Sequence, residues 1–238
     1  MPRARRLLLV FVAALAFSGA AFAAAASGPQ FQPAPADQTW ADSIVLTAKD
    51  VGSDWRPSGV AEAITGSVDD AADCAAADLS DLVLTGGTYS PDFFRSDGAY
   101  ATSSAVVWQT PEQAQGDWDR NLQPALMGCL AAALQGASTK KVKVIVTGRR
   151  QLATWPALAP RSVAYRVSLL LKAKIKSAKR TRTLSVRATS DLLAVGSGRA
   201  RAMLWTLSFD RQPLNDFTKQ RWAMVMAQRL AADPAAPK

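Results

Sequence analysis

The clearest pattern of hydrophobic and polar positions runs from Arg161 to Ile175, which reads RSVAYRVSLLLKAKI. The odd-numbered positions from Val163 to Ile175 are apolar, whereas serine, arginine and lysine fill most of the positions between them. Side chains alternate across a β-strand, so a period of two gives one buried face and one solvated face. This stretch predicts a long half-buried strand, and we expect the fold to be built around it.

Shorter stretches of alternating or continuously apolar residues predict further strands. They cover residues 56–66, 83–89, 93–95, 99–109, 141–147, 149–155, 183–189 and 202–209. In the second half of the chain these strands follow one another at short intervals, and Gly196-Ser197-Gly198 predicts a tight turn before the last of them. That spacing is typical of an antiparallel meander.

Helical spacing of apolar residues predicts helices over residues 111–122, 124–135 and roughly 215–230. Thr110 can cap the first of these, and Pro111 suits its first position. Pro124 should divide the helical stretch, because proline removes a backbone donor and clashes with the preceding turn. Since the helices lie apart from the meander in sequence, the predicted class is α+β, a twisted antiparallel sheet with helices packed on one face.

The first residues of the chain predict a secretory signal peptide over residues 1–26. Three arginines among the first six residues precede the apolar run Leu7–Phe17, and small residues follow. Cleavage patterns end at both Ala23 and Ala26, and the pattern does not choose between them. Eleven apolar residues are too few to span a bilayer, so we expect a secreted, extracytoplasmic chain without a membrane span after cleavage.

The remaining chain divides into three parts by composition. Residues 27–39 hold three prolines and no apolar periodicity, which predicts a linker. Residues 40–232 are expected to form a single α+β domain, and residues 233–238 a loose tail.

The formal net charge is +9, or +6 without the three arginines of the signal peptide, and this favours anionic partners. A basic run surrounds the predicted hairpin tip after the long strand, and it comprises Lys172, Lys174, Lys176, Lys179, Arg180 and Arg182. Two interpretations stay open: a docking site for an anionic partner, or charges that keep an edge hairpin from pairing with another chain. No aromatic residue lies within the run, which argues against a nucleic-acid partner.

The chain has two cysteines, Cys74 and Cys129. In an exported protein an even pair is most simply a disulfide, and this is our prediction. The alternative is two buried free thiols.

The sequence shows no catalytic or cofactor motif. Histidine is absent, which removes Ser-His and Cys-His nucleophile systems and the commonest metal ligand. Ser138 and Lys141 match S-x-x-K but lack the companion motifs of that chemistry. We expect a protein that is not an enzyme and has no cofactor and no metal site. An enzyme that uses carboxylates or serine is the remaining alternative.

Several features resemble, in order, the PknH-type extracellular sensor domain family of actinobacteria, as a free-standing secreted member. They are Leu46-Thr47-Ala48-Lys49-Asp50-Val51-Gly52 with Trp55, the Cys74 segment leading into Asp78-Leu79-Ser80, Pro124 before Cys129, and the strand and helix over 202–231. The resemblance covers residues 40–232. It implies a twisted antiparallel sheet with helices on one side and a cleft for a small ligand. The chain departs from the receptor kinases of that family in having no kinase domain, no transmembrane helix, no lipid-attachment cysteine and only one possible disulfide. No motif carries binding residues across.

Two hypotheses on function follow. The first is a secreted, non-enzymatic, sensor-like binding protein with a cleft between sheet and helices for a small or envelope-derived ligand. The alternative is an interaction protein that docks on anionic cell-wall polymer or lipid through the basic hairpin around Lys172–Arg182.

Overall fold

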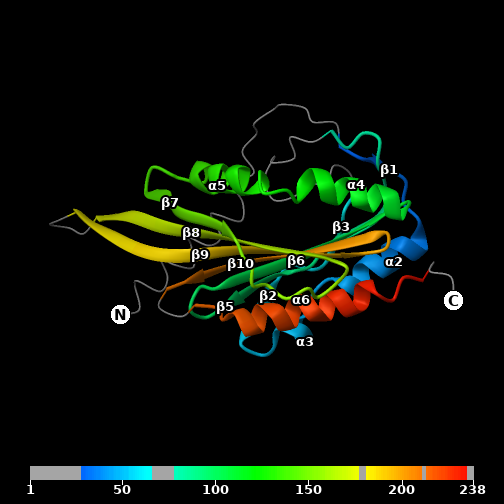
Figure 1. Cartoon of the computed structure of the whole chain (residues 1–238). Helices are drawn as coiled ribbons and strands as arrows, with labels where there is room; N and C mark the ends of the chain where they lie inside the picture. Colours follow the sequence, from blue (N-terminus) through cyan, green and yellow to red (C-terminus); the bar gives the residue numbers. More distant parts are fainter. Residues whose placement is uncertain (1–27, 66–77, 177–180, 211–212, 235–238) are drawn as a thin grey trace.

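The computed structural model describes residues 28–65, 78–176, 181–210 and 213–234, and they form a single ten-stranded twisted sheet with helices (Figure 1). In spatial order the main path is β1 (Gln30–Phe31), β4 (Val83–Tyr89), β6 (Tyr100–Trp108), β10 (Ala200–Phe209), β9 (Thr181–Ser197), β8 (Arg161–Lys176) and β7 (Val142–Gln151). Off this path are β2 (Trp55–Ser58), β3 (Glu62–Ala63) and β5 (Asp92–Arg95). The described pairings are antiparallel except β1 with β4. The predicted α+β class is confirmed.

The strand predicted from the period of two is β8, and it pairs with a neighbour on each side. Its partner β9 joins the predicted strand 183–189 to residues 191–195, which the sequence predicted as a continuation past a bulge, and the register with β8 is continuous through both. On its other side, residues 141–147 and 149–155 were expected to form two strands. They contribute instead to the single strand β7, which carries a bulge between Val146 and Gly148.

The helices are α2 (Pro35–Ile44), α3 (Ala48–Val51), α4 (Pro111–Asn121), α5 (Leu126–Gly136) and α6 (Asp216–Leu230). The three predicted helices, α4, α5 and α6, begin within two residues of their predicted starts, whereas α2 and α3 were not predicted. The hydroxyl of Thr110 accepts a hydrogen bond from the Gln113 N–H at 3.3 Å, and Asn215 Oδ1 accepts one from the Thr218 N–H at 2.7 Å. Both side chains satisfy N–H groups that would otherwise lack a partner in the first turn.

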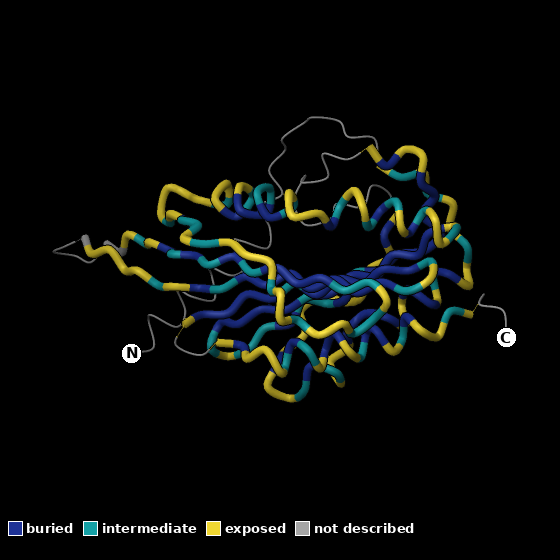
Figure 2. Tube along the Cα trace, in the orientation of Figure 1, coloured by how far each residue is buried: buried dark blue, intermediate teal, exposed yellow. Residues whose placement is uncertain are grey.

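Helices lie on both faces of the sheet, whereas the sequence predicted them on one. Figures 1 and 2 show α4 and α5 over one face and α2, α3 and α6 over the other. The cause is visible in β10, where Ala202 and Leu204 enter one apolar core and Met203 and Leu207 enter the other. A strand that is apolar on both faces needs cover on both.

Residues 27–39, predicted to be a linker, carry β1 and the start of α2. Pro35 occupies the first turn of α2, where a missing N–H has no cost. Arg199 fixes this helix by donating to both carboxylate oxygens of Asp37 at 3.0 Å. The same guanidinium donates to Asp233 Oδ1 at 3.2 Å, so the segment after α6 is also held.

The predicted signal peptide, residues 1–26, lies outside the described residues. So does Cys74, and the pairing with Cys129 on α5 stays a prediction. Within the part of the chain that the structure describes, no helix is long and apolar enough to cross a membrane.

Helix α2 lies very close to β4, and the contact requires glycine. A Cβ added to Gly86 would lie 2.6 Å from the carbonyl carbon and oxygen of Asp37 and 2.8 Å from the backbone nitrogen of Gln38. Because these neighbours are backbone atoms, they cannot move aside as a flexible side chain could.

We therefore expect Gly86→Ala to lower the free energy of unfolding by about 1–3 kcal/mol, the usual cost of overpacking. The matched control is Gly136→Ala at the end of α5, where an added Cβ meets no atom within 4 Å. Urea unfolding followed by tryptophan fluorescence measures both variants. Equal stabilities of the two would show that α2 is not held against β4 in solution.

A second prediction concerns acid. Burial acts to raise the pKa of Asp37, but hydrogen bonds from Arg199 and Thr85 outweigh it, so the pKa is lowered overall. A lowered folded pKa contributes stability that is complete above the unfolded value, about 3.9, and is lost as pH falls through the folded value. Asp37→Asn should therefore flatten the loss of unfolding free energy below about pH 4. Denaturant titrations across this range test it, and an unchanged pH dependence would contradict it.

Candidate functional site

The most distinctive charge feature is a long segment without acidic residues. Residues 121–190 contain 14 lysines and arginines and no aspartate or glutamate, whereas the rest of the chain holds 14 basic and 19 acidic residues. The segment folds into α5, β7, β8 and the first part of β9. Because β7, β8 and β9 are neighbours at one edge of the sheet, most of its charges lie on that side of the molecule.

We call this region the cationic end and define it by nine exposed side chains on β7–β9 and the turn before β7. They are Lys140, Lys141, Lys143, Arg149, Arg150, Lys172, Lys174, Arg182 and Arg187. None of the nine forms an ion pair with another described residue. Their positive charges are therefore free to act on an external anion.

The structure brings together part of the basic run predicted from the sequence. Lys172 and Lys174 are exposed on β8 and share one face, as expected. Arg182 pairs with Ile175, so it lies on the opposite face from Lys174. Lys176 ends β8 with its side chain outside the description, and Lys179 and Arg180 lie outside the described residues.

Sequence reasoning missed two cations that the strand register adds to this face. Lys143 of β7 lies directly opposite Lys172, and Arg187 of β9 lies opposite Leu170. Residues opposite each other in a ladder share a face of the sheet. The absence of acids between residues 121 and 190 was the signal that could have led to them.

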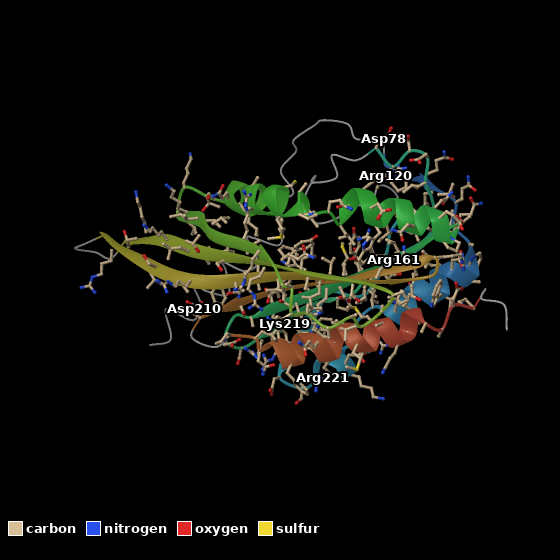
Figure 3. The ribbon with its side chains drawn as sticks, in the orientation of Figure 1. Asp78, Arg120, Arg161, Asp210, Lys219 and Arg221 are labelled. Carbon is tan, nitrogen blue, oxygen red and sulfur yellow. The ribbon has the colours of Figure 1, made fainter. Side chains whose placement is uncertain are left out.

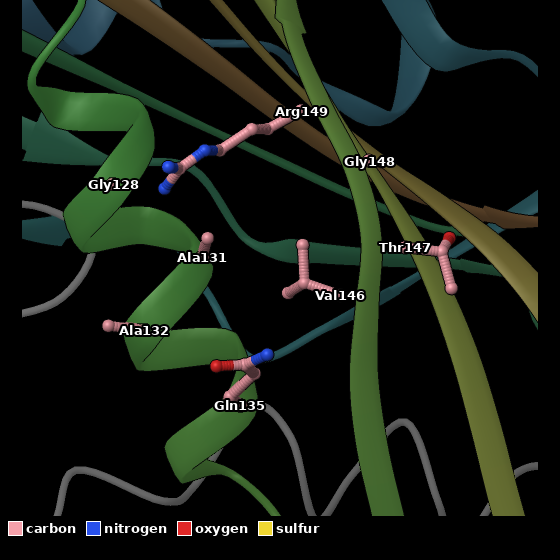
Figure 4. Close-up of a pocket in the computed structure, with 8 residues that line it drawn as sticks. All are labelled: Gly128, Ala131, Ala132, Gln135, Val146, Thr147, Gly148 and Arg149. Atoms are coloured by element: carbon pink, nitrogen blue, oxygen red, sulfur yellow. The ribbon is translucent and has the colours of Figure 1, made fainter.

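The opposite face of β7 carries a pocket against α5, with a volume of about 370 Å³ (Figure 4). Its lining residues are Gly128, Ala131, Ala132, Gln135, Val146, Thr147, Gly148 and Arg149. The small helix residues and the β-bulge leave this space open. Figure 4 shows the Arg149 side chain reaching from β7 toward the helix near Gly128. This pocket combines apolar walls with one cationic group, and a small ligand with an anionic end matches that chemistry.

On the face covered by α6, a buried ionic network joins the helix to β8 and β9 (Figure 3 labels Lys219). Arg166 Nε lies 2.6 Å from Asp191 Oδ1, and its Nη2 lies 2.6 Å from Asp216 Oδ1. Lys219 pairs with Asp191 and also lies 2.7 Å from Asp216 Oδ1. Two cations thus face two carboxylates, and the network is neutral as a whole.

The pKa shifts in this network follow its hydrogen bonds. The bond to Asp191 is the largest cause that raises the pKa of Arg166. Burial acts to raise the pKa of Asp216, but hydrogen bonds from Lys219 and Arg166 more than offset it, so the pKa is lowered. Both groups are therefore held in their charged forms.

A second buried carboxylate is satisfied in the same way under α4. Asp117 accepts hydrogen bonds from Arg201 Nε at 2.7 Å, Trp108 Nε1 at 3.2 Å and Asn121 Nδ2 at 2.7 Å.

The hydroxyl of Ser138 donates to the Gln135 carbonyl at 2.7 Å and accepts from the Val144 N–H at 3.0 Å. These groups serve the fold through their local partners.

Comparisons with protein families, curated proteins and solved structures find one weak structural similarity. No protein-family model matches the chain. No curated protein matches it. Among solved structures, the extracellular domain of PknH from Mycobacterium tuberculosis is similar with a TM-score of 0.40 and 9% sequence identity, over 83% of this chain and 97% of that chain. A similarity of this size assigns the chain to no family.

The buried network gives a stability prediction. Lys219→Met should lower the free energy of unfolding by about 3 kcal/mol, because it takes one cation away from the buried carboxylate of Asp191. The matched control is Arg120→Met, which breaks the exposed pair with Asp81 and should change stability little, since surface ion pairs contribute little. Chemical denaturation compares the two, and equal effects would contradict a structural role for the network.

Proposed function

We propose that this chain is an extracytoplasmic, non-enzymatic binding protein that holds an anionic ligand of the cell envelope at its cationic end. The observation that carries the proposal is the group of nine exposed cations that form no ion pair with any described residue, in a segment free of aspartate and glutamate. A surface of one charge sign attracts ligands of the other and raises their local concentration. The amino-terminal signal pattern supports the extracytoplasmic setting.

The alternative explanation is that the nine cations only keep an exposed strand edge from pairing with another protein chain. That explanation suits β7, which is the outer strand of the main path. It does not suit Lys172, because β8 is paired with β7 and β9 at this residue. Nor does it suit Arg187, which pairs with Leu170 and accepts a backbone hydrogen bond from Asp210 at 3.2 Å. Interior strand positions have no free edge to protect.

The second candidate is a small ligand in the α5–β7 pocket, which is favoured by the position of Arg149 at its wall. Both candidates use cations of the same segment, but on different faces of β7. A ligand enclosed between the walls of the pocket would be less sensitive to salt than one held on the exposed face, because buried contacts are screened less.

Neither candidate involves catalysis. The carboxylates of Asp117 and Asp191 are buried and paired with Arg201 and Lys219, so neither is exposed to a substrate. The protein acts, in this proposal, by holding its ligand.

The proposal predicts how binding to purified cell envelopes of the source host responds to charge reversal. Replacing Lys143, Lys172 and Lys174 by glutamate should lower the affinity at least tenfold, because the attracting charges are inverted. Adding salt should weaken wild-type binding steeply, since exposed charges are screened within about 10 Å at 0.1 M salt. A cosedimentation assay measures both effects.

The matched control replaces Lys49, Arg56 and Arg221 by glutamate, which changes the net charge equally. These three cations are exposed, lie outside the cationic end and form no ion pair with described residues. If both triple variants lost binding alike, overall charge and not the cationic end would govern binding. If neither lost binding, the proposal would be abandoned.

A further inference from the structure

We infer that the α6-side face of the cationic end is a binding surface for a linear polyanion, a polymer that carries phosphate or carboxylate groups at regular intervals. The inference rests on the proposed function, because it uses the same cations, and it adds the class of partner. Its core is the set Lys143, Lys172, Lys174 and Arg187 on one face of three adjacent strands.

The cations are arranged in a way that is unfavourable without an anion. Lys143 and Lys172 are directly opposite in neighbouring strands, and like charges in this position destabilise a sheet. Lys174 adds a third charge two residues along β8, about 6.6 Å away, while neighbouring strands are about 4.8 Å apart. Anionic groups placed among these three side chains would remove their repulsion.

The residues between the cations are suited to a polar polymer. Ser185 is opposite Lys172, and Thr183 is opposite Lys174, so both hydroxyls share the cationic face. Both residues are exposed. Hydroxyls can donate hydrogen bonds to phosphate, carboxylate or sugar oxygens beside the charged contacts.

The shape of this side favours a chain over a flat membrane. Helix α6 begins at the ion pairs with Arg166, and Lys172 lies six residues further along β8, about 20 Å away. In Figure 1 the β8–β9 ladder extends past the start of α6. The cationic face is therefore set back from the outer side of α6 by about one helix diameter, 10–12 Å. A thin polymer can lie in this step, whereas a planar bilayer would meet α6 first.

The face also lacks apolar anchors of the kind that hold a protein in a bilayer. Among the described residues, the large exposed apolar side chains are Val60, Leu184, Phe217 and Met224. Leu184 is opposite Ala173, on the other face from Lys172. Phe217 and Met224 belong to α6, beyond the step. Interfacial binding combines basic residues with exposed apolar ones on one surface, whereas the apolar residues Ile145 and Leu170 of this face are only partly exposed.

The exposed carboxylate of Asp210 borders the surface on the β10 side. Asp210 follows β10, and its backbone N–H donates to the Arg187 carbonyl at 3.2 Å. Figure 3 shows Asp210 near the end of β10, where the β8–β9 ladder extends beyond the helices. This acid marks the limit of the cationic face, and its removal should extend the face toward β10.

The experiment titrates the full secreted chain with polyphosphate of graded length, and with orthophosphate at the same total phosphate, by isothermal calorimetry. We expect the longer chains to bind at least tenfold more tightly per phosphate, since one chain engages several cations at once. Affinity should rise with length and level off once the chain spans the face. Asp210→Asn should bind polyphosphate more tightly than the wild type.

The decisive variant is Lys172→Glu. It should lower polyphosphate affinity at least tenfold and yet raise the melting temperature, because Lys143 then faces an opposite charge. A variant that merely damaged the fold would lower both quantities. Lys49→Glu on α3 makes the same charge change elsewhere and should alter neither.

Vesicles of phosphatidylcholine with and without phosphatidylglycerol complete the test. If anionic vesicles bound through Lys172 while polyphosphate bound no better than orthophosphate, the polymer would be the wrong partner and the proposed function would stand. If Lys172→Glu left polyphosphate affinity unchanged, the surface assignment would be overturned. Loss of envelope binding in the control triple variant as well would overturn the proposed function itself.

Discussion

The neutral network of Arg166, Asp191, Lys219 and Asp216 is the interaction on which the arrangement of the molecule depends. It fastens the start of α6 to β8 and β9 at the boundary between the covered part of the sheet and the cationic end. A buried ion pair contributes little net stability compared with apolar packing, but leaving one of its charges unpaired is costly. The network therefore selects one position of α6 on the sheet over others, and this position leaves the face around Lys172 uncovered.

The backbone pairing and the apolar packing of the sheet offset the charge repulsion within the cationic end. Charges of one sign placed on adjacent strands repel one another, so the segment needs compensation from elsewhere in the fold. The long antiparallel ladder between β8 and β9 provides it through backbone hydrogen bonds, and Val167, Leu169 and Leu171 bury the opposite face against α4 and α5. One face of the same strands thus stabilises the fold while the other carries charge. The alternation of apolar and polar residues that predicted β8 thus separates a buried face from a charged face across three strands.

Elements that depend only on residues close together in the sequence were predicted correctly. The alternation after Arg161 predicted β8, and Thr110 and Asn215 marked the starts of α4 and α6, because a strand period and a helix cap depend on neighbours in sequence. The cover on both faces was missed because small residues such as Ala164 and Ala202 interrupt the polar face without looking apolar enough to be core. The start of α2 was missed because Pro35, read as a linker residue, suits a first helical turn equally well.

The candidate site depended on information that no local pattern contains. That Lys143 faces Lys172 follows from the register between strands, and the β-bulge between Val146 and Gly148 changes that register by one residue. A shift of one residue exchanges the two faces of a strand. Before the bulge, the odd residue Lys143 points to the α6 side; after it, Arg149 lies on the α5 side and lines the pocket. Because of this one inserted residue, Lys143 and Arg149 lie on opposite faces of β7, and each candidate site has a cation. The two sites can therefore be tested separately, since a substitution on one face leaves the other face of β7 intact.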